Sequence, residues 1–240
     1  MSAAIDSRER VLGRIRAAAR NFAAADPQPA AKDAQELAGA DAAIPRRYAR
    51  SGRLSAEARM ALMAERLREY GAEVAVCKPE ELAAAITQQI AASGRRIFVA
   101  PPGIPVAWRV EVANKIKGFE CSFDHGLQIG EIEQAEGVMT AAFCGIADSG
   151  TIVLHHSASE GRRMLTLLPD WHLCILKASQ VVETLPEYFD RCPQPPALVT
   201  WISGPSATAD IEMTRIQGVH GPRFLNVILA DDRGKEPAVH

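Results

Sequence analysis

The chain has 240 residues, of which 48% are apolar and 23% charged, and its formal net charge is −2. An apolar fraction of this size excludes disorder as the dominant state, and no apolar run reaches the ~20 residues of a transmembrane helix. The near-neutral charge also argues against a dedicated nucleic-acid-binding protein.

The N-terminal part of the chain predicts a helical arm. Residues 5–22 carry apolar side chains at helical spacing with arginines opposite, a pattern typical of an amphipathic helix with a basic face. Residues 23–50 are rich in alanine, proline and aspartate and predict an extended segment. Ser55 can cap the helix that follows. We therefore expect an arm over residues 1–54 and one α/β domain over residues 55–240.

From residue 72 onward, predicted strands and helices alternate. Apolar runs predict strands over 72–77, 95–100, 138–144, 151–156, 172–177, 197–203 and 224–230. Helices are predicted over 79–92, within 103–118, over 162–168 and 184–191, and from about residue 207 through Ile216. This alternation predicts an open, mainly parallel sheet with helices on both faces. The turn at 145–150 is too short for a crossover helix, so the strands flanking it are expected to pair antiparallel.

One candidate site follows the predicted strand at 197–203. Gly204, Pro205, Ser206, Thr208 and Asp210 lie where a helix is expected to begin. Free backbone N–H groups and the helix dipole at such a turn attract a phosphate or carboxylate, and the hydroxyls add donors. An ordinary N-cap made by Ser206 explains the pattern equally well. The string also approaches the Gly-x-Ser-x-Gly nucleophile elbow, but its second glycine is missing.

A second candidate site is the tight turn formed by Asp148, Ser149, Gly150 and Thr151. A carboxylate beside two hydroxyls can act as a base, a nucleophile or a ligand clamp. Spacing alone favours an Asx-type turn, in which Asp148 bonds its own backbone. Because ligands gather at the carboxyl ends of parallel strands, we expect this turn and the 204–210 turn to meet there and form one anion pocket.

Histidines and arginines supply further candidates. His220 lies in a glycine-bracketed loop before the last strand and is a candidate acid, base or anion contact, although a structural histidine fits as well. His155 and His156 are neighbours in a predicted strand, so at most one of them can face a site. Three arginines are candidates to pair with an anionic ligand, or else form surface ion pairs: Arg162, Arg163 and Arg223.

Five cysteines lie far apart, with no C-x-x-C motif and no compact Cys/His cluster. We therefore expect no metal site, and no iron–sulfur cluster or other cofactor bound by this chain. The N-terminus lacks the pattern of a signal peptide, and an odd number of cysteines fits reduced thiols. These features predict a cytoplasmic protein.

Three segments together resemble the LutC/YkgG family, the lactate utilization protein C group of the LUD domain. They are GIADSGTIVL at 145–154, RRMLTLLPDWHLCIL at 162–176, and SGPSATADIEMTRIQGVHGPR at 203–223. The resemblance covers roughly residues 55–232. The family turn commonly reads Gly-Ile-Ala-Glu-Thr-Gly-Thr, whereas this chain has Asp148-Ser149, whose carboxylate is one methylene shorter.

The resemblance implies a fold of the NagB/RpiA/CoA-transferase type and a role in oxidation of L-lactate to pyruvate. It also implies that this chain acts with partner proteins that carry the iron–sulfur clusters, while it supplies an anion pocket or a docking surface as a subunit of an oxidoreductase system. A stand-alone acyl/CoA-transferase-like or sugar-phosphate isomerase-like enzyme that uses Asp148 is the alternative. A sensor of a small hydroxy acid or phosphate is a third possibility.

Overall fold

The computed structural model describes residues 7–24, 48–208, 216–217 and 221–233. The chain divides into two units, Met1–Tyr48 and Ala49–His240. In the first unit, α1 (Ser7–Ala24) confirms the predicted N-terminal helix, while most of the predicted extended segment lies outside the described residues. Within the described part of the chain, no helix combines the length and the apolar character needed to cross a membrane.

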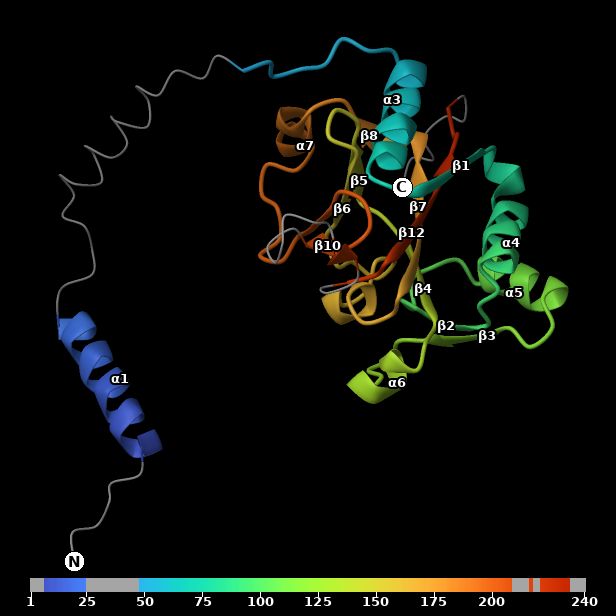
Figure 1. Cartoon of the computed structure of the whole chain (residues 1–240). Coiled ribbons are helices and arrows are strands. Elements are labelled where there is room, and N and C mark those ends of the chain that lie inside the picture. Colours follow the sequence, from blue (N-terminus) through green and yellow to red (C-terminus); the bar gives the residue numbers. More distant parts are fainter. Residues whose placement is uncertain (1–6, 25–47, 209–215, 218–220, 234–240) are drawn as a thin grey trace, which may run out of the picture. The chain divides into compact units, whose positions relative to one another are not determined.

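Six parallel strands form the main sheet of the second unit, in the order β1-β12-β7-β4-β2-β3 (Figure 1). Their bounds are Glu73–Cys77 for β1, Ile97–Ala100 for β2, Glu120–Phe123 for β3, Gly137–Ala141 for β4, Trp171–Lys177 for β7 and Phe224–Ala230 for β12. The predicted α/β fold with a mainly parallel sheet is therefore confirmed.

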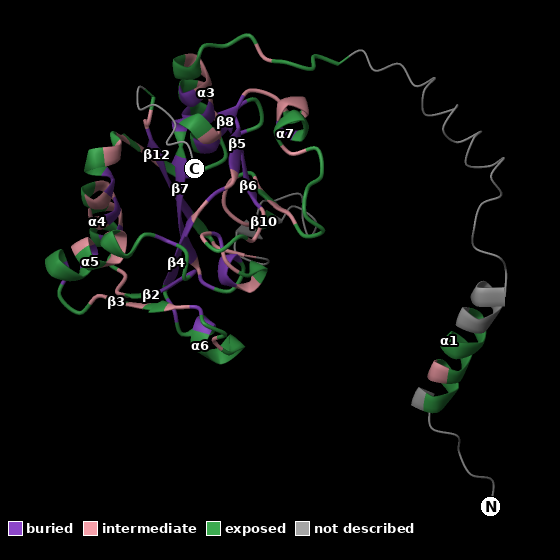
Figure 2. Ribbon diagram, turned by 180° about the vertical axis from the view of Figure 1, so that it is seen from behind, coloured by how far each residue is buried: buried purple, intermediate pink, exposed green. Residues whose placement is uncertain are grey.

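Helices cover both faces of this sheet. On one face α4 (Leu82–Ser93) and α5 (Val106–Lys115) pack against alternate residues of the central strands, such as Ile228 of β12. On the other face α3 (Ala56–Glu69) packs against the intervening residues, such as Val227. The Ser55 hydroxyl caps α3 by accepting from the Ala58 N–H at 3.2 Å, as predicted. Figure 2 shows the buried central strands between helices whose outer surfaces are exposed.

A second, four-stranded sheet shares the face that α3 covers. Its order is β8-β5-β6-β9, with bounds Val181–Val182, Cys144–Ile146, Thr151–Leu154 and Thr200–Ile202. β6 pairs antiparallel with β5 and with β9, and Ile152 and Leu154 of β6 join the same apolar cluster as α3. The chain segment from 144 to 154 is thereby placed over the main sheet.

The single strand predicted over 138–144 is wrong. β4 ends at Ala141 within the main sheet, and β5 begins at Cys144 in the second sheet. The strands that pair antiparallel are β5 and β6, while β4 pairs parallel with β2 and β7. Both strands are buried, so their apolar residues form one continuous run. Such a run shows no alternation of apolar and polar residues that would mark where β4 ends and β5 begins.

The helix predicted from about residue 207 through Ile216 is wrong at both of its described ends. β10 (Ala207–Thr208) pairs antiparallel with β11 (Ile216–Gln217). The Ser206 N–H donates to the Pro222 carbonyl at 2.9 Å, which ties the chain to a distant segment instead of starting a helical turn.

The remaining described elements are short. They are η1 (Pro79–Glu81), α6 (Ile129–Glu133), η2 (Arg163–Thr166), η3 (Ala178–Gln180) and α7 (Leu185–Arg191). The Glu187 carboxylate accepts from the Thr184 N–H at 2.9 Å, so the acidic half of the predicted capping box is present at the start of α7.

Candidate functional site

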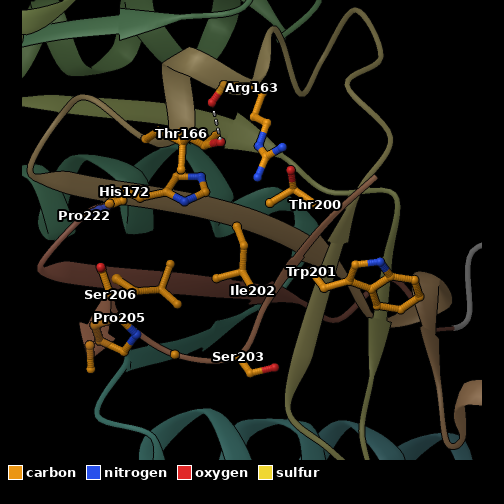
Figure 3. A pocket seen from close by; sticks show the side chains of 15 residues that line it. Arg163, Thr166, His172, Thr200, Trp201, Ile202, Ser203, Pro205, Ser206 and Pro222 are labelled. Atoms are coloured by element: carbon orange, nitrogen blue, oxygen red, sulfur yellow. Dashed lines mark hydrogen bonds between the residues drawn. The ribbon is translucent and has the colours of Figure 1, made fainter. Parts of the chain in front are cut away.

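A cavity of about 330 Å³ lies where η2, the end of β9 and the first residues of β7 and β12 meet (Figure 3). Arg163, Thr166, His172, Thr200, Ser203 and Ser206 supply its polar side chains. We call it the Arg163 cavity. His172 and Leu225 are the second residues of β7 and β12, so the cavity lies at the amino ends of these parallel strands. The expected place at their carboxyl ends is therefore wrong.

Arg163 brings a positive charge to this cavity. Its side chain is exposed, and no acidic group among the described residues pairs with it. The other two candidate arginines are engaged. Arg162 donates to both oxygens of Asp124, at 2.7 and 2.5 Å, and Arg223 donates to both oxygens of Asp170, at 2.5 and 2.8 Å. Of the three, Arg163 is the one that has no carboxylate partner among the residues that the structure describes.

The Arg162–Asp124 pair anchors the segment that carries Arg163. The Asp124 side chain is buried, and its Oδ1 also accepts from the backbone N–H groups of Gly126 and Leu127. The hydrogen bonds from Arg162 hold the pKa of Asp124 below its ordinary value. A folded-state pKa below the unfolded one stabilises the native state above about pH 4, and this contribution is lost as the pH falls through the lower pKa.

Replacing Arg162 with glutamine is expected to lower the free energy of unfolding by about 2 kcal/mol at neutral pH, because a buried carboxylate then loses its charged partner. Solvent around the half-exposed Arg162 side chain keeps the loss below that of a fully buried pair. Urea unfolding at pH 7 and at pH 3 measures it. The difference between variant and wild type should shrink at pH 3, and an equal difference at both pH values would contradict the assignment.

His172 is a site residue that the sequence patterns assigned only to a strand. Its side chain is 1% exposed, and Nε2 lies 2.8 Å from the Thr140 hydroxyl. Burial lowers the pKa of His172 to about 4, so the ring is neutral at pH 7. Within the described part of the chain, Nδ1 meets no hydrogen-bond partner of its own, and the residue lines the cavity. His172 thus contributes a neutral imidazole to the lining of the cavity.

Two threonine hydroxyls of the cavity already have partners. Thr166 Oγ1 donates to the Arg163 carbonyl at 3.1 Å (Figure 3), and Thr200 Oγ1 lies 2.8 Å from His156 Nε2. His155, by contrast, bonds the Tyr188 hydroxyl at 2.8 Å and stacks on Phe143, so it belongs to the packing around α7.

The turn at 148–151 lines a different cavity, of about 230 Å³, with Ile146, Leu185, Trp201 and Ser203. We call it the Asp148 cavity. Ser149 Oγ, Thr151 Oγ1 and Ser203 Oγ form a chain of hydroxyls with spacings of 2.7 and 2.8 Å. Figure 3 shows the Trp201 indole on the side of β9 away from Thr200 and His172. The two predicted turns therefore meet at Ser203 but do not form one pocket.

Asp148 does not make the expected Asx-type turn. Its carboxylate is exposed, and the turn is closed by the Gly150 N–H, which donates to the Ala147 carbonyl at 3.2 Å. The negative charge of Asp148 disfavours an anionic ligand in this second cavity. Ser149 and Thr151 stay candidates for neutral contacts there.

Packing on α3 explains why two of the predicted ligand-binding residues are glycines. Gly150 has φ +60°, and a Cβ there would lie 2.7 Å from Arg66 Cβ. Gly204 has φ +86°, and its Cβ would lie 2.6 Å from Tyr70 Cβ. A side chain at either position would be strained and would collide with the end of α3.

The other predicted residues divide into three groups. Pro205 and Ser206 line the Arg163 cavity. Thr208 is the second residue of β10, and the placement of its side chain is not described. Asp210 and His220 lie outside the described residues. Among the residues that the structure does place, no group of three His, Cys, Asp or Glu side chains is arranged to hold a metal ion.

The residues that line both cavities lie within the part of the chain that a known family model matches. The family model described as "LUD domain" matches residues 60–230. A Deinococcus radiodurans protein named "Lactate utilization protein C" is 38% identical over 171 residues, which is 69% of this chain and 76% of the relative. A solved structure of a DUF162 family protein from Deinococcus radiodurans has a TM-score of 0.59 and 29% identity, covering 74% of this chain and 99% of that one.

Two further relatives match over a shorter stretch. A Bacillus subtilis protein named "Lactate utilization protein C" is 37% identical over 44% of this chain and 46% of its own length. An Escherichia coli protein named "Uncharacterized protein YkgG" is 38% identical over 43% of this chain and 48% of its own length. The aligned part of this chain thus spans about half the length of these two relatives.

Proposed function

The chain belongs to the LUD domain family, and from this premise we propose that it acts in lactate utilization by binding a small hydroxy acid in the Arg163 cavity. The observation that carries the proposal is an exposed guanidinium, with no carboxylate partner among the described residues, at a cavity whose other polar side chains are hydroxyls and a neutral imidazole. A guanidinium binds a carboxylate through two parallel hydrogen bonds, and hydroxyls suit the oxygen on the neighbouring carbon. The cavity is large enough to admit a three-carbon acid with some of its water.

Lactate oxidation to pyruvate removes two electrons, so the system needs an electron acceptor. We propose that partner proteins with iron–sulfur clusters supply it, and that this chain presents or holds the acid within such an assembly. The proposal draws support from the resemblance to the LutC/YkgG group and from the relatives named for lactate utilization. A cytoplasmic location accords with this role.

Growth tests the pathway assignment. A strain that lacks the gene for this chain is expected to lose growth on L-lactate and to keep growth on pyruvate, because only the first substrate requires the oxidation. The wild-type chain supplied on a plasmid should restore growth. Unimpaired growth of the deletion strain on L-lactate would refute the role.

Affinity capture tests the partner assignment. Tagged full-length chain, purified from cells grown on L-lactate, should retain proteins whose absorption near 400 nm and iron content mark iron–sulfur clusters. Cells grown on pyruvate serve as the control. Recovery of the chain alone from lactate-grown cells would refute the partner proposal.

A further inference from the structure

His156 has an unusual backbone conformation for a residue with a side chain. Among the described residues it is the one non-glycine residue with a positive φ, at +57°. A residue with a Cβ adopts this conformation at some cost, and it persists where the surroundings hold it there. His156 lies two residues after the end of β6, and its ring lies between Gly161 and Thr200. The ring therefore connects Gly161, two residues before Arg163, with Thr200 of β9, and both Arg163 and Thr200 line the same cavity.

The two hydrogen bonds of the ring determine which way the proton of Thr200 points. Nδ1 lies 2.9 Å from the Gly161 carbonyl, which can only accept, so Nδ1 carries the hydrogen. In a neutral imidazole Nε2 is then an acceptor. In that tautomer the Thr200 hydroxyl, 2.8 Å from Nε2, donates to it.

A threonine whose hydrogen is committed in this way offers only lone pairs to a ligand. Thr166 is in the same state, because its hydrogen is donated to the Arg163 carbonyl. In Figure 3 the Thr200 hydroxyl and the Arg163 guanidinium point toward each other at the cavity. The cavity thus sets a cationic donor beside hydroxyl oxygens that act as acceptors.

We infer that His156 makes the Arg163 cavity selective for 2-hydroxy acids over 2-oxo acids. The inference rests on the proposed function of the cavity. A 2-hydroxy acid places its carboxylate on Arg163 and donates its hydroxyl hydrogen to Thr200 Oγ1. A 2-oxo acid presents a carbonyl oxygen to the same lone pairs, which leaves two acceptors face to face. The loss of one hydrogen bond of this kind corresponds to roughly ten-fold in affinity.

The test compares the dissociation constants of L-lactate and pyruvate for the full chain by calorimetry at one pH. Wild type is expected to bind L-lactate about ten-fold more tightly. In His156→Asn, the amide can still donate to Gly161, and asparagine tolerates a positive φ. It no longer reaches Thr200, whose hydroxyl becomes free to donate, so the preference should fall to about one. His125→Asn changes an exposed histidine outside the cavity and should keep the wild-type preference.

Substitutions at Thr200 test whether His156 acts through the Thr200 hydroxyl or only through the stability of the fold. Thr200→Val should abolish the preference, Thr200→Ser should retain it, and His156→Asn should have no further effect on the preference in the Thr200→Val background. An undiminished preference in either His156→Asn or Thr200→Val would overturn the inference while the binding function stands. Absence of binding of both acids to wild type would overturn the proposed function, and the inference with it.

Discussion

Replacing Arg163 with glutamine is expected to weaken L-lactate binding to the full chain by roughly 10- to 100-fold. The guanidinium lines the cavity, and within the described part of the chain no carboxylate competes for it. Loss of one charge-assisted hydrogen bond to the ligand carboxylate costs about 1.5–3 kcal/mol, while glutamine can still donate one neutral hydrogen bond. Arg163→Lys keeps the charge but loses the planar fork, so an intermediate loss is expected. Isothermal titration calorimetry with L-lactate measures the effect.

Two matched variants control for a general loss of charge. Arg223→Gln removes an arginine that is held by both oxygens of Asp170 and that does not line the cavity. Asp148→Asn changes the carboxylate of the second cavity. Both are expected to keep the L-lactate affinity within about two-fold of wild type, a change of less than ~0.5 kcal/mol. If Arg163→Gln also binds with wild-type affinity, the carboxylate does not bind at Arg163. If Asp148→Asn alone abolishes binding, the ligand lies in the Asp148 cavity.

The stability of the fold is expected to fall by about 3 kcal/mol between pH 6.5 and pH 4 through His172 alone. The ring is buried and its pKa is lowered to about 4, whereas the unfolded chain titrates near pH 6.5. Between these values the unfolded state holds a proton that the native state lacks. Stability therefore rises with pH across this window and is fully restored above it.

Urea unfolding at half-unit steps from pH 4 to pH 7.5 measures this slope, with His172→Gln as the comparison. Glutamine keeps a polar atom near the position of Nε2, which can bond the Thr140 hydroxyl, and it does not titrate. The variant is expected to show a flatter profile over pH 4–6.5. Parallel profiles for the two proteins would show that His172 takes up its proton as easily in the native state as in the unfolded one.

Much of the architecture follows from local sequence signals. The strands β7 and β12 are continuous apolar runs, as expected of strands buried on both faces, and they form the centre of the parallel sheet. Ser55 begins α3, and Gly94, with φ +72°, ends α4. These signals act within a few residues of one another, which is why they can be recognised in a linear sequence.

The errors occur where distant segments compete with such signals. The run at 138–144 divides between two sheets because β4 pairs with β7 and β2, while β5 pairs with β6 and β8. The turn after Gly204 looks like the start of a helix, yet the Ser206 N–H is held by the Pro222 carbonyl. Pairing with partners that lie tens of residues away cannot be recognised from the sequence of the strand itself.

For the candidate site, the sequence predicts which kinds of group could bind a ligand, but it does not predict how they are arranged. The glycines and hydroxyl residues at 148–151 and 204–210 predict turns, and the arginines predict contacts with an anion. Which arginine is available depends on whether a carboxylate reaches it: Asp124 reaches Arg162, Asp170 reaches Arg223, and the described residues provide no such carboxylate for Arg163. His172 becomes a cavity residue only because β7 begins beside β9 and η2.

The order of residues thus defines the fold class, the caps and the family of this chain, since these depend on periodicity and on short motifs. The division between two cavities, the ion pairs of Arg162 and Arg223, and the contacts of the His156 ring with Gly161 and Thr200 arise from three-dimensional packing. Hydrogen bonds and ion pairs act over about 3 Å, and folding determines which groups come that close.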